Sequence, residues 1–256
     1  MSRLPASQRL ASIAAAATEA FGRLGYRGTL TADVAARAGM SAGSLFTYVE
    51  SKEALFHLVF VYGLGQPPEP PAELPLATPG PGETFALIGR ALRELPVPRL
   101  RAALAGNEPA DVAQELREIV GEFYDLTERY WPLLAVIERC AVELPELDAL
   151  WFGAARAGIH AELAEYLHHR ISGGRLRPMP DAMVAARVVI ESVAWFAWHR
   201  HEGRDSALYD DQTTRRTVIE FICAALVPDS APGGAQPHTA HRGSPPGLLP
   251  SPAKEH

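Results

Sequence analysis

The sequence predicts an all-α protein, with a small N-terminal three-helix domain followed by a larger helical domain. Three observations lead to this prediction. Apolar residues recur at intervals of three and four along most of the chain, which places them on one face of an α-helix. No segment shows the alternating apolar and polar pattern of a strand bounded by turns. Two proline-rich segments interrupt the helical pattern, because proline removes a backbone donor and clashes inside helices.

The prolines also set the predicted domain boundaries. Seven of the 22 prolines lie within residues 66–82, and seven more lie within 228–252. We interpret the first segment as a stiff linker and the second, which is also rich in Gly, Ser and His, as a disordered tail. We therefore predict an N-terminal domain with its connecting helix over residues 1–62 and a linker over 63–82. A helical body follows over 83–227, and a tail over 228–256.

Composition and charge narrow the class of protein. With 47% hydrophobic and 21% charged residues, the chain of 256 residues is long and apolar enough to bury a core. Its net charge of −6 excludes a uniformly basic surface. The charge is uneven, however: residues 1–62 hold six basic and four acidic side chains, a net +2, and the remainder holds 18 and 26, a net −8. The sequence therefore predicts a basic head on an acidic body.

Cysteine content and the N-terminal segment indicate the compartment. The two cysteines, Cys140 and Cys223, exclude a disulfide framework and favour a reducing environment. Residues 1–20 lack the long apolar core of a signal peptide or membrane span. We therefore expect a cytoplasmic protein.

The first helix and the pair of helices after it predict a helix-turn-helix unit. Leu10 to Leu24 carry an apolar face. We expect Thr31 to cap a helix over 32–38 that Gly39 ends, because glycine takes a positive φ at little cost. Ser41 is expected to cap a second helix over 42–48. In such a unit the second helix enters the DNA major groove with its N-terminal residues.

Residue types in this unit suit contact with DNA. Gly43 leaves room for close approach, and the hydroxyls of Ser44, Thr47 and Tyr48 are suited to reach bases or phosphates. Ser51 caps the next helix and puts Lys52 at a helix N-terminus, where ammonium, backbone N–H groups and the helix dipole favour a phosphate. The candidate DNA-binding residues are Thr31, Ala42, Gly43, Ser44, Thr47, Tyr48 and Lys52.

This region resembles the TetR family of bacterial transcriptional regulators over about 45 residues. The matching residues are Phe21 to Tyr26, Thr31 to Gly39, Ser41, Gly43 to Phe46, Tyr48 and Ser51 to Leu55. The resemblance implies a homodimer that binds a palindromic DNA operator and is released by a small apolar or amphipathic effector bound in the larger domain. It implies sequence-specific transcriptional regulation, most often repression.

Three positions depart from the family pattern. Ala42 stands where lysine is common, Phe46 where tyrosine is usual, and Val49 where an aromatic residue often follows Tyr48. The predicted recognition helix therefore carries no cation. DNA affinity must depend on Lys52, Tyr48 and Thr31, with Arg3, Arg9 and Arg27 as further candidates. Two alternatives follow: a helical, dimeric ligand-binding or interaction protein that has weakened or lost DNA binding, and a purely structural helix hairpin.

The body is expected to contain several helices. We predict one over 85–95 and one from Asp111 to about Arg129, with Pro132 kinking or restarting the helix that runs on to 144. Pro145 suits the first turn of a helix running toward residue 171. Asp181 is expected to cap a long apolar helix to about 199, and Asp210 or Asp211 to open the last helix, which ends before 228.

The last two helices are candidates for a dimer interface. The helix after Asp181 is apolar on more than one face, with Val188 and Phe196 on one side and Val184 and Trp195 on the flank. Two such helices from each of two chains would form a four-helix bundle. The alternative is burial of both helices within one chain.

Aromatic side chains in the body are candidates for an effector pocket, since pockets are mostly apolar with a few polar anchors. The aromatic candidates are Phe123, Trp131, Trp151, Phe152, Trp195 and Trp198. The candidate anchors are Glu138, Glu143, Arg156, His160 and Glu191.

Metal, cofactor and enzyme functions find no support in the pattern. His199 and His201, like His168 and His169, are too close in sequence to share a helix face, and no ligand spacing joins them to Cys or carboxylate residues. The sequence has no GxxxxGK[ST] or HExxH motif. Gly39 to Gly43 match GxSxG, but they lie in the predicted turn between two helices, with no strand before them to form a nucleophile elbow. We therefore expect no metal, no cofactor and no catalytic residue.

Overall fold

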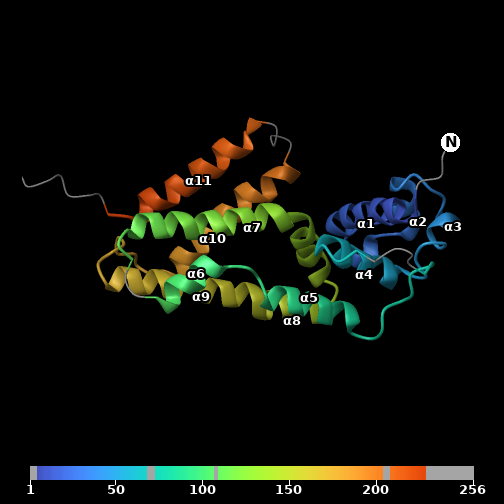
Figure 1. Ribbon diagram of the computed structural model, residues 1–256, viewed down its shortest axis with the longest axis horizontal. Helices are drawn as coiled ribbons and strands as arrows, with labels where there is room; N and C mark the ends of the chain where they lie inside the picture. Colours follow the sequence, from blue (N-terminus) through green and yellow to red (C-terminus); the bar gives the residue numbers. More distant parts are fainter. Residues whose placement is uncertain (1–4, 68–72, 107–108, 204–207, 229–256) are drawn as a thin grey trace, which may run out of the picture.

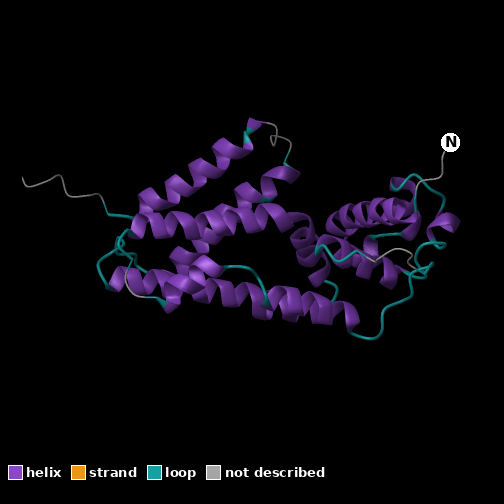
Figure 2. Ribbon diagram, viewed as in Figure 1, coloured by secondary structure: helices purple, strands orange, loops and turns teal. Residues whose placement is uncertain are grey.

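The computed structural model describes residues 5–67, 73–106, 109–203 and 208–228, and every named element within them is helical (Figures 1 and 2). This confirms the predicted all-α class. A head of four helices lies at one end of an elongated molecule, and the body extends away from it (Figure 1). The expected tail, apart from Pro228, lies outside the described residues.

The head consists of α1 (Ala6–Gly28), α2 (Thr31–Arg37), α3 (Ala42–Leu45) and α4 (Lys52–Gly63). The apolar face of α1 is buried against α2 and α4, as its spacing predicts. This core includes Ile13, Phe21, Val34, Leu45 and Leu55, none of which is exposed.

The body begins with α5 (Glu83–Arg93), α6 (Pro98–Ala105) and the long α7 (Val112–Ala141). It continues through a nearly unbroken helical run of α8 (Pro145–Leu150), a π-helical turn η1 (Trp151–Ala155) and α9 (Arg156–Ser172). It ends with α10 (Ala182–Ala197), the 3₁₀ turn η2 (His199–Glu202) and α11 (Asp211–Leu226). The carboxylates of Asp111, Asp181 and Asp210 cap α7, α10 and α11.

Helix α7 belongs to both parts of the molecule. Its C-terminal part contains Pro132 and turns toward the head (Figure 1). There Leu133, Val136 and Cys140 join the same buried core as α1 and α4. The first half of α7 lies in a second core, formed with α6, α9, α10 and α11. A movement of α7 would therefore change the packing of both cores.

The proline-rich segment before α5 does not behave as a simple spacer at its described end. The N–H of Leu76 donates to the carbonyl of Tyr48 at 2.8 Å, and the N–H of Glu50 donates to the carbonyl of Leu76 at 3.0 Å. The backbone of Thr78 donates to Glu50 Oε2 at 2.9 Å. Residues 76–78 thus run beside the turn between α3 and α4 and hold it in place.

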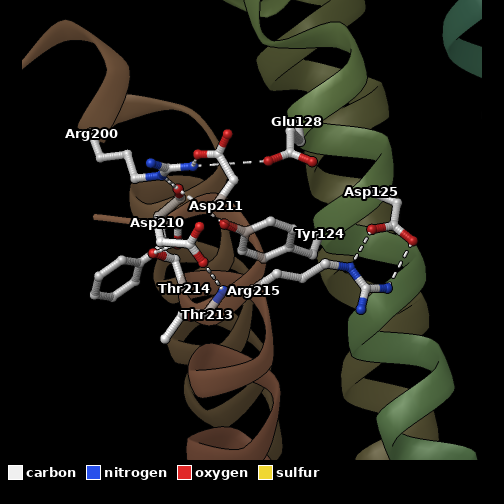
Figure 3. A network of polar contacts seen from close by, with 10 residues as sticks. Tyr124, Asp125, Glu128, Arg200, Asp210, Asp211, Thr213, Thr214 and Arg215 are labelled. Carbon is white, nitrogen blue, oxygen red and sulfur yellow. Dashed lines mark hydrogen bonds and ion pairs between the residues drawn. The ribbon is translucent and has the colours of Figure 1, made fainter. Parts of the chain in front are cut away.

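A network of polar contacts fixes α11 and η2 against α7 (Figure 3). The buried guanidinium of Arg200 pairs with Asp211 and lies 3.9 Å from Glu128 Oε1. Beside it, Arg215 forms a two-pronged ion pair with Asp125, at 2.5 and 2.8 Å. The network sets the position of the last two helices relative to the rest of the body.

Two expectations about local structure are wrong, and one helix was not predicted. Thr31 is not the cap of α2: Leu30 is, and its carbonyl accepts from Asp33 and Val34 with no side-chain cap. The helix after Ser41 ends at Leu45 and continues as turns, rather than reaching residue 48. The helix over 98–105 was not anticipated, although Pro98 occupies its favoured first position.

Candidate functional sites

The turn between α2 and α3 presents the N-terminal end of α3 to solvent. Gly39 has a φ of 68°, the left-handed conformation that glycine adopts without strain. The N–H of Met40 then bonds back to the carbonyl of Ala35 at 2.9 Å. Ser41 caps α3, accepting from the N–H of Ser44 at 3.1 Å. The expected helix-turn-helix geometry is therefore present.

The outer face of α3 is uncharged and open. Leu45 is buried beneath it, whereas Ala42, Gly43, Ser44, Phe46 and Thr47 are exposed. Two of its hydroxyls already have partners within the chain, because Ser44 Oγ lies 2.8 Å from Ser41 Oγ and Thr47 Oγ1 donates to the carbonyl of Ser44 at 2.7 Å. These contacts hold the hydroxyls at fixed places on the surface.

A substitution at Gly43 can test DNA recognition without disturbing the packing of the head. A Cβ built there would meet nothing within 4 Å, so the fold does not require glycine. Gly43→Ala should leave the free energy of unfolding unchanged or raise it by about 0.5–1 kcal/mol, because alanine favours the helix. If the face lies against DNA, the added methyl group should weaken DNA binding.

Urea denaturation and DNA titration of the same Gly43→Ala protein check both halves of this prediction. Gly39→Ala is the matched control, since its positive φ makes the substitution destabilising with no neighbour within 4 Å. A stable Gly43→Ala protein with undiminished DNA affinity would contradict the assignment of this face.

Lys52 lies at the N-terminal end of α4, the helix that follows α3. Ser51 caps α4, accepting from the N–H of Ala54 at 3.0 Å, so Lys52 is the first residue of that helix, as expected. Its ammonium donates to the carbonyl of Arg27 at 3.4 Å and lies 4.8 Å from the ring centroid of Tyr26. Lys52 is thus held at a helix N-terminus beside the end of α1.

Tyr26 supports this arrangement. Its hydroxyl donates to Glu53 Oε1 at 3.2 Å. Burial and the Glu53 carboxylate raise the pKa of Tyr26 to about 12, so the phenol stays protonated. The remaining candidates, Tyr48 and Thr31, are half-buried.

A second candidate site is a cavity of about 110 Å³ enclosed by α7, α9, α10 and the π-helical turn η1. Three of the six aromatic candidates line it: Phe123, Trp151 and Trp198. Of the others, Trp131 stacks on His201 in an outer groove, while Phe152 and Trp195 lie outside the cavity with much of their surface exposed.

Four of the five candidate anchors lie at this cavity. Trp151 Nε1 donates to Glu138 Oε1 at 3.2 Å, and Arg156 donates to Glu191 Oε1 at 2.6 Å. His160, which is 7% exposed, donates from Nδ1 to the carbonyl of Arg156 at 2.6 Å. Glu143 lies elsewhere, where its Oε2 accepts from the N–H of Arg27 at 2.6 Å and joins the end of α7 to the head.

The α7 side of the cavity was not predicted from the sequence. Leu126, Tyr130 and Leu134 line it at intervals of four residues, together with Thr127. Their spacing was visible in the sequence as a second apolar stripe on the helix. A π-helical turn inside a helix, which often marks a functional site, gave no such signal.

Both cysteines are buried free thiols. Burial raises the pKa of Cys140 to about 12 and that of Cys223 to about 11, which keeps both as unreactive thiols at neutral pH. In the described ranges, no three His, Cys, Asp or Glu side chains gather as a metal site would require. None of the helices placed by the structure is long and apolar enough to cross a membrane.

The comparisons with known proteins agree with the head geometry. Residues 13–59 match the model of the bacterial regulatory proteins of the tetR family. No curated protein sequence matches the chain.

Solved structures share the fold over most of the chain. The ketosteroid transcriptional regulator KstR2 of Mycobacterium tuberculosis is 16% identical and covers 86% of this chain and 96% of its own, with a TM-score of 0.55. A TetR family transcriptional regulator from Chloroflexus aurantiacus J-10-FL is 14% identical, with coverage of 89% and 96% and a TM-score of 0.50. A bacterial regulatory protein in the tetR family from Rhodococcus RHA1 is 17% identical, with coverage of 87% and 100% and a TM-score of 0.50.

Proposed function

Since the N-terminal domain of this chain is a TetR-family domain, we propose that the protein is a sequence-specific, DNA-binding transcriptional regulator, most simply a repressor released by a small-molecule effector. The observation that carries the proposal is the exposed, capped N-terminal end of α3 beyond a left-handed glycine turn. That end presents small and hydroxyl side chains, which suit base edges and thymine methyl groups.

A homodimer would supply two heads for a palindromic operator. Support comes from the apolar side chains that α10 and α11 leave exposed. Val184, Val188 and Trp195 on α10 are 62%, 60% and 43% exposed, and Phe221 on α11 is 73% exposed. We propose that these two helices pair with their copies in a four-helix bundle.

The route from effector to DNA would follow α7. Tyr130, Leu134 and Glu138 on this helix line the body cavity. Leu133 and Cys140, on the same stretch, belong to the core shared with the head. A ligand that widens the cavity therefore shifts a helix against which the head is packed, which changes the separation of the two α3 helices in a dimer.

The proposal places the protein in the cytoplasm, where its DNA lies, and assigns it no catalytic role. A second candidate function is a dimeric ligand-binding protein that no longer binds DNA. One observation favours it: Ala42, Gly43, Ser44, Phe46 and Thr47 give the exposed face of α3 no positive charge. DNA titration separates the two, because only the regulator forms a salt-sensitive complex.

Lys52→Ala tests the regulator proposal directly. If the Lys52 ammonium contacts a phosphate, its removal should weaken binding to operator and non-operator DNA alike and lower the salt slope of log K by about 0.9. Fluorescence anisotropy with labelled DNA at several salt concentrations measures this slope.

Arg101→Ala is the control for the Lys52 variant. It removes one positive charge from α6 in the body, where Arg101 Nε lies 3.4 Å from Glu162 Oε2, and should leave the slope unchanged. An unchanged slope in folded Lys52→Ala would remove this residue from the phosphate contacts.

A further inference from the structure

We propose that the cavity between α7, α9 and α10 binds a small, uncharged aromatic molecule that donates a hydrogen bond, such as a phenol, to His160 Nε2. This inference rests on the proposed function, in which the body holds the effector, and names the chemical class of that effector. Three features of the cavity carry it: an acceptor atom without a partner, the charge of the wall, and the size and lining of the space.

The acceptor is fixed by the other nitrogen of the same ring. His160 Nδ1 lies 2.6 Å from the backbone carbonyl of Arg156, and a carbonyl only accepts, so Nδ1 carries the proton. In the neutral ring Nε2 is then an acceptor. Within the part of the chain that the structure describes, buried Nε2 has no hydrogen-bond partner. A buried polar atom without a partner is unfavourable, and a ligand hydroxyl would satisfy it.

The charged groups of the wall disfavour an anionic ligand. The positive charge of Arg156 is matched by Glu191, whose Oε1 also lies 2.7 Å from Arg187 Nε. Among the residues that the structure describes, the donor to Glu138 is the neutral indole N–H of Trp151. Glu138, Glu191, Arg156 and Arg187 together carry no net charge, so the wall offers no excess positive charge to offset the desolvation of a carboxylate or phosphate.

The size and lining select a single ring. Apolar cavities of about 150 Å³ hold one benzene molecule, and drug-sized ligands need about 300 Å³ or more. The present cavity of about 110 Å³ therefore suits a monocyclic ligand after a small expansion. Phe123, Trp151 and Trp198 supply aromatic surfaces for such a ring, and Leu126 and Ile159 supply apolar ones.

The test compares three probes that share one ring: phenol, anisole and benzoate. Anisole keeps the ring and oxygen but has no donor, and benzoate adds a negative charge. We expect phenol to bind at least about 10-fold more tightly than either, as followed by NMR titration of the indole N–H signals of Trp151 and Trp198. The ¹⁵N signal of His160 Nε2 should shift with phenol and stay in place with anisole.

Variants distinguish the contribution of the His160 acceptor to ligand affinity from the contribution of the cavity shape. His160→Phe keeps a ring but removes the acceptor, so the preference for phenol over anisole should disappear while anisole affinity is retained. His160→Gln restores an acceptor oxygen and should recover part of the preference. Val142→Ala changes a side chain that is 81% exposed at the end of α7 and lies outside the cavity lining, so it should leave both affinities unchanged.

Two results would overturn the proposal: equal binding of phenol and anisole, or failure of all three probes to bind the folded protein. A His160→Phe protein that keeps the preference for phenol would equally remove Nε2 as the acceptor. Because no DNA is present in these titrations, their failure leaves the DNA-binding proposal standing, and failure of DNA binding leaves the ligand result intact.

Discussion

Replacing Arg170 by methionine is expected to lower the free energy of unfolding by about 3 kcal/mol, the lower end of the range for a broken buried ion pair. The Arg170 side chain is 1% exposed, and its Nε and Nη2 bond to Glu115 at 2.9 and 3.1 Å. Nη2 also donates to the carbonyl of Ala103 at 3.1 Å. The variant leaves the Glu115 carboxylate, whose side chain is 18% exposed, without its cation.

Urea denaturation of the Arg170 variant and two companions tests this explanation. Arg23→Met breaks an exposed pair with Glu19, in which the Arg23 side chain is 65% exposed, and should change stability by less than about 1 kcal/mol. Adding Glu115→Leu to Arg170→Met removes the stranded charge and should restore part of the loss. An Arg170→Met protein as stable as Arg23→Met would show that the buried pair is not a stabilising contact.

Gly25→Ala is expected to have an effect of similar size, at the junction of head and body. Gly25 has φ 76° and ψ −179°, a conformation that is essentially restricted to glycine and costs other residues about 1–3 kcal/mol. A Cβ there would lie 2.3 Å from Glu143 Oε1. The carboxylate would have to move, and its bond to the N–H of Arg27 would be lost. Together these effects should destabilise the protein by about 3 kcal/mol or more.

The Gly25 prediction has two separable parts, strain and collision. Gly25→Ala combined with Glu143→Ala removes the collision but not the strain, so thermal unfolding should show partial recovery relative to Gly25→Ala alone. Wild-type stability in the single variant would mean that α1 ends differently from the geometry described above.

The fold class and most helix boundaries followed from local chemistry. Ser41, Ser51 and Asp181 each cap the helix that their position predicted, because a short polar side chain before an apolar repeat satisfies the first free N–H groups. Asp210, one of the two residues expected to open the last helix, is its cap. The cap predicted at Thr31 is wrong because, in the sequence, a threonine at the first position of a helix cannot be distinguished from one at the cap position.

The sequence contains no comparable signal for contacts between residues that are far apart in the chain. The bonds of Leu76 to Tyr48 and Glu50 join segments separated by about 26 residues, and nothing in a proline-rich stretch predicts them. In the body, periodicity showed which face of a helix is apolar but not whether that face meets another helix or a cavity. Phe123 and Trp198 therefore line the cavity, whereas Trp195, equally apolar in pattern, is exposed.

The most direct test of the central claim is a mobility-shift titration on the DNA immediately upstream of the protein's own gene. If the protein is a DNA-binding transcriptional regulator, we expect a saturable complex with two protomers per site. This complex should persist in the presence of competitor DNA and weaken as the salt concentration rises. A folded dimer that gives no shift at low salt would contradict that claim. It would show instead that an α3 face without cations belongs to a head that does not bind DNA.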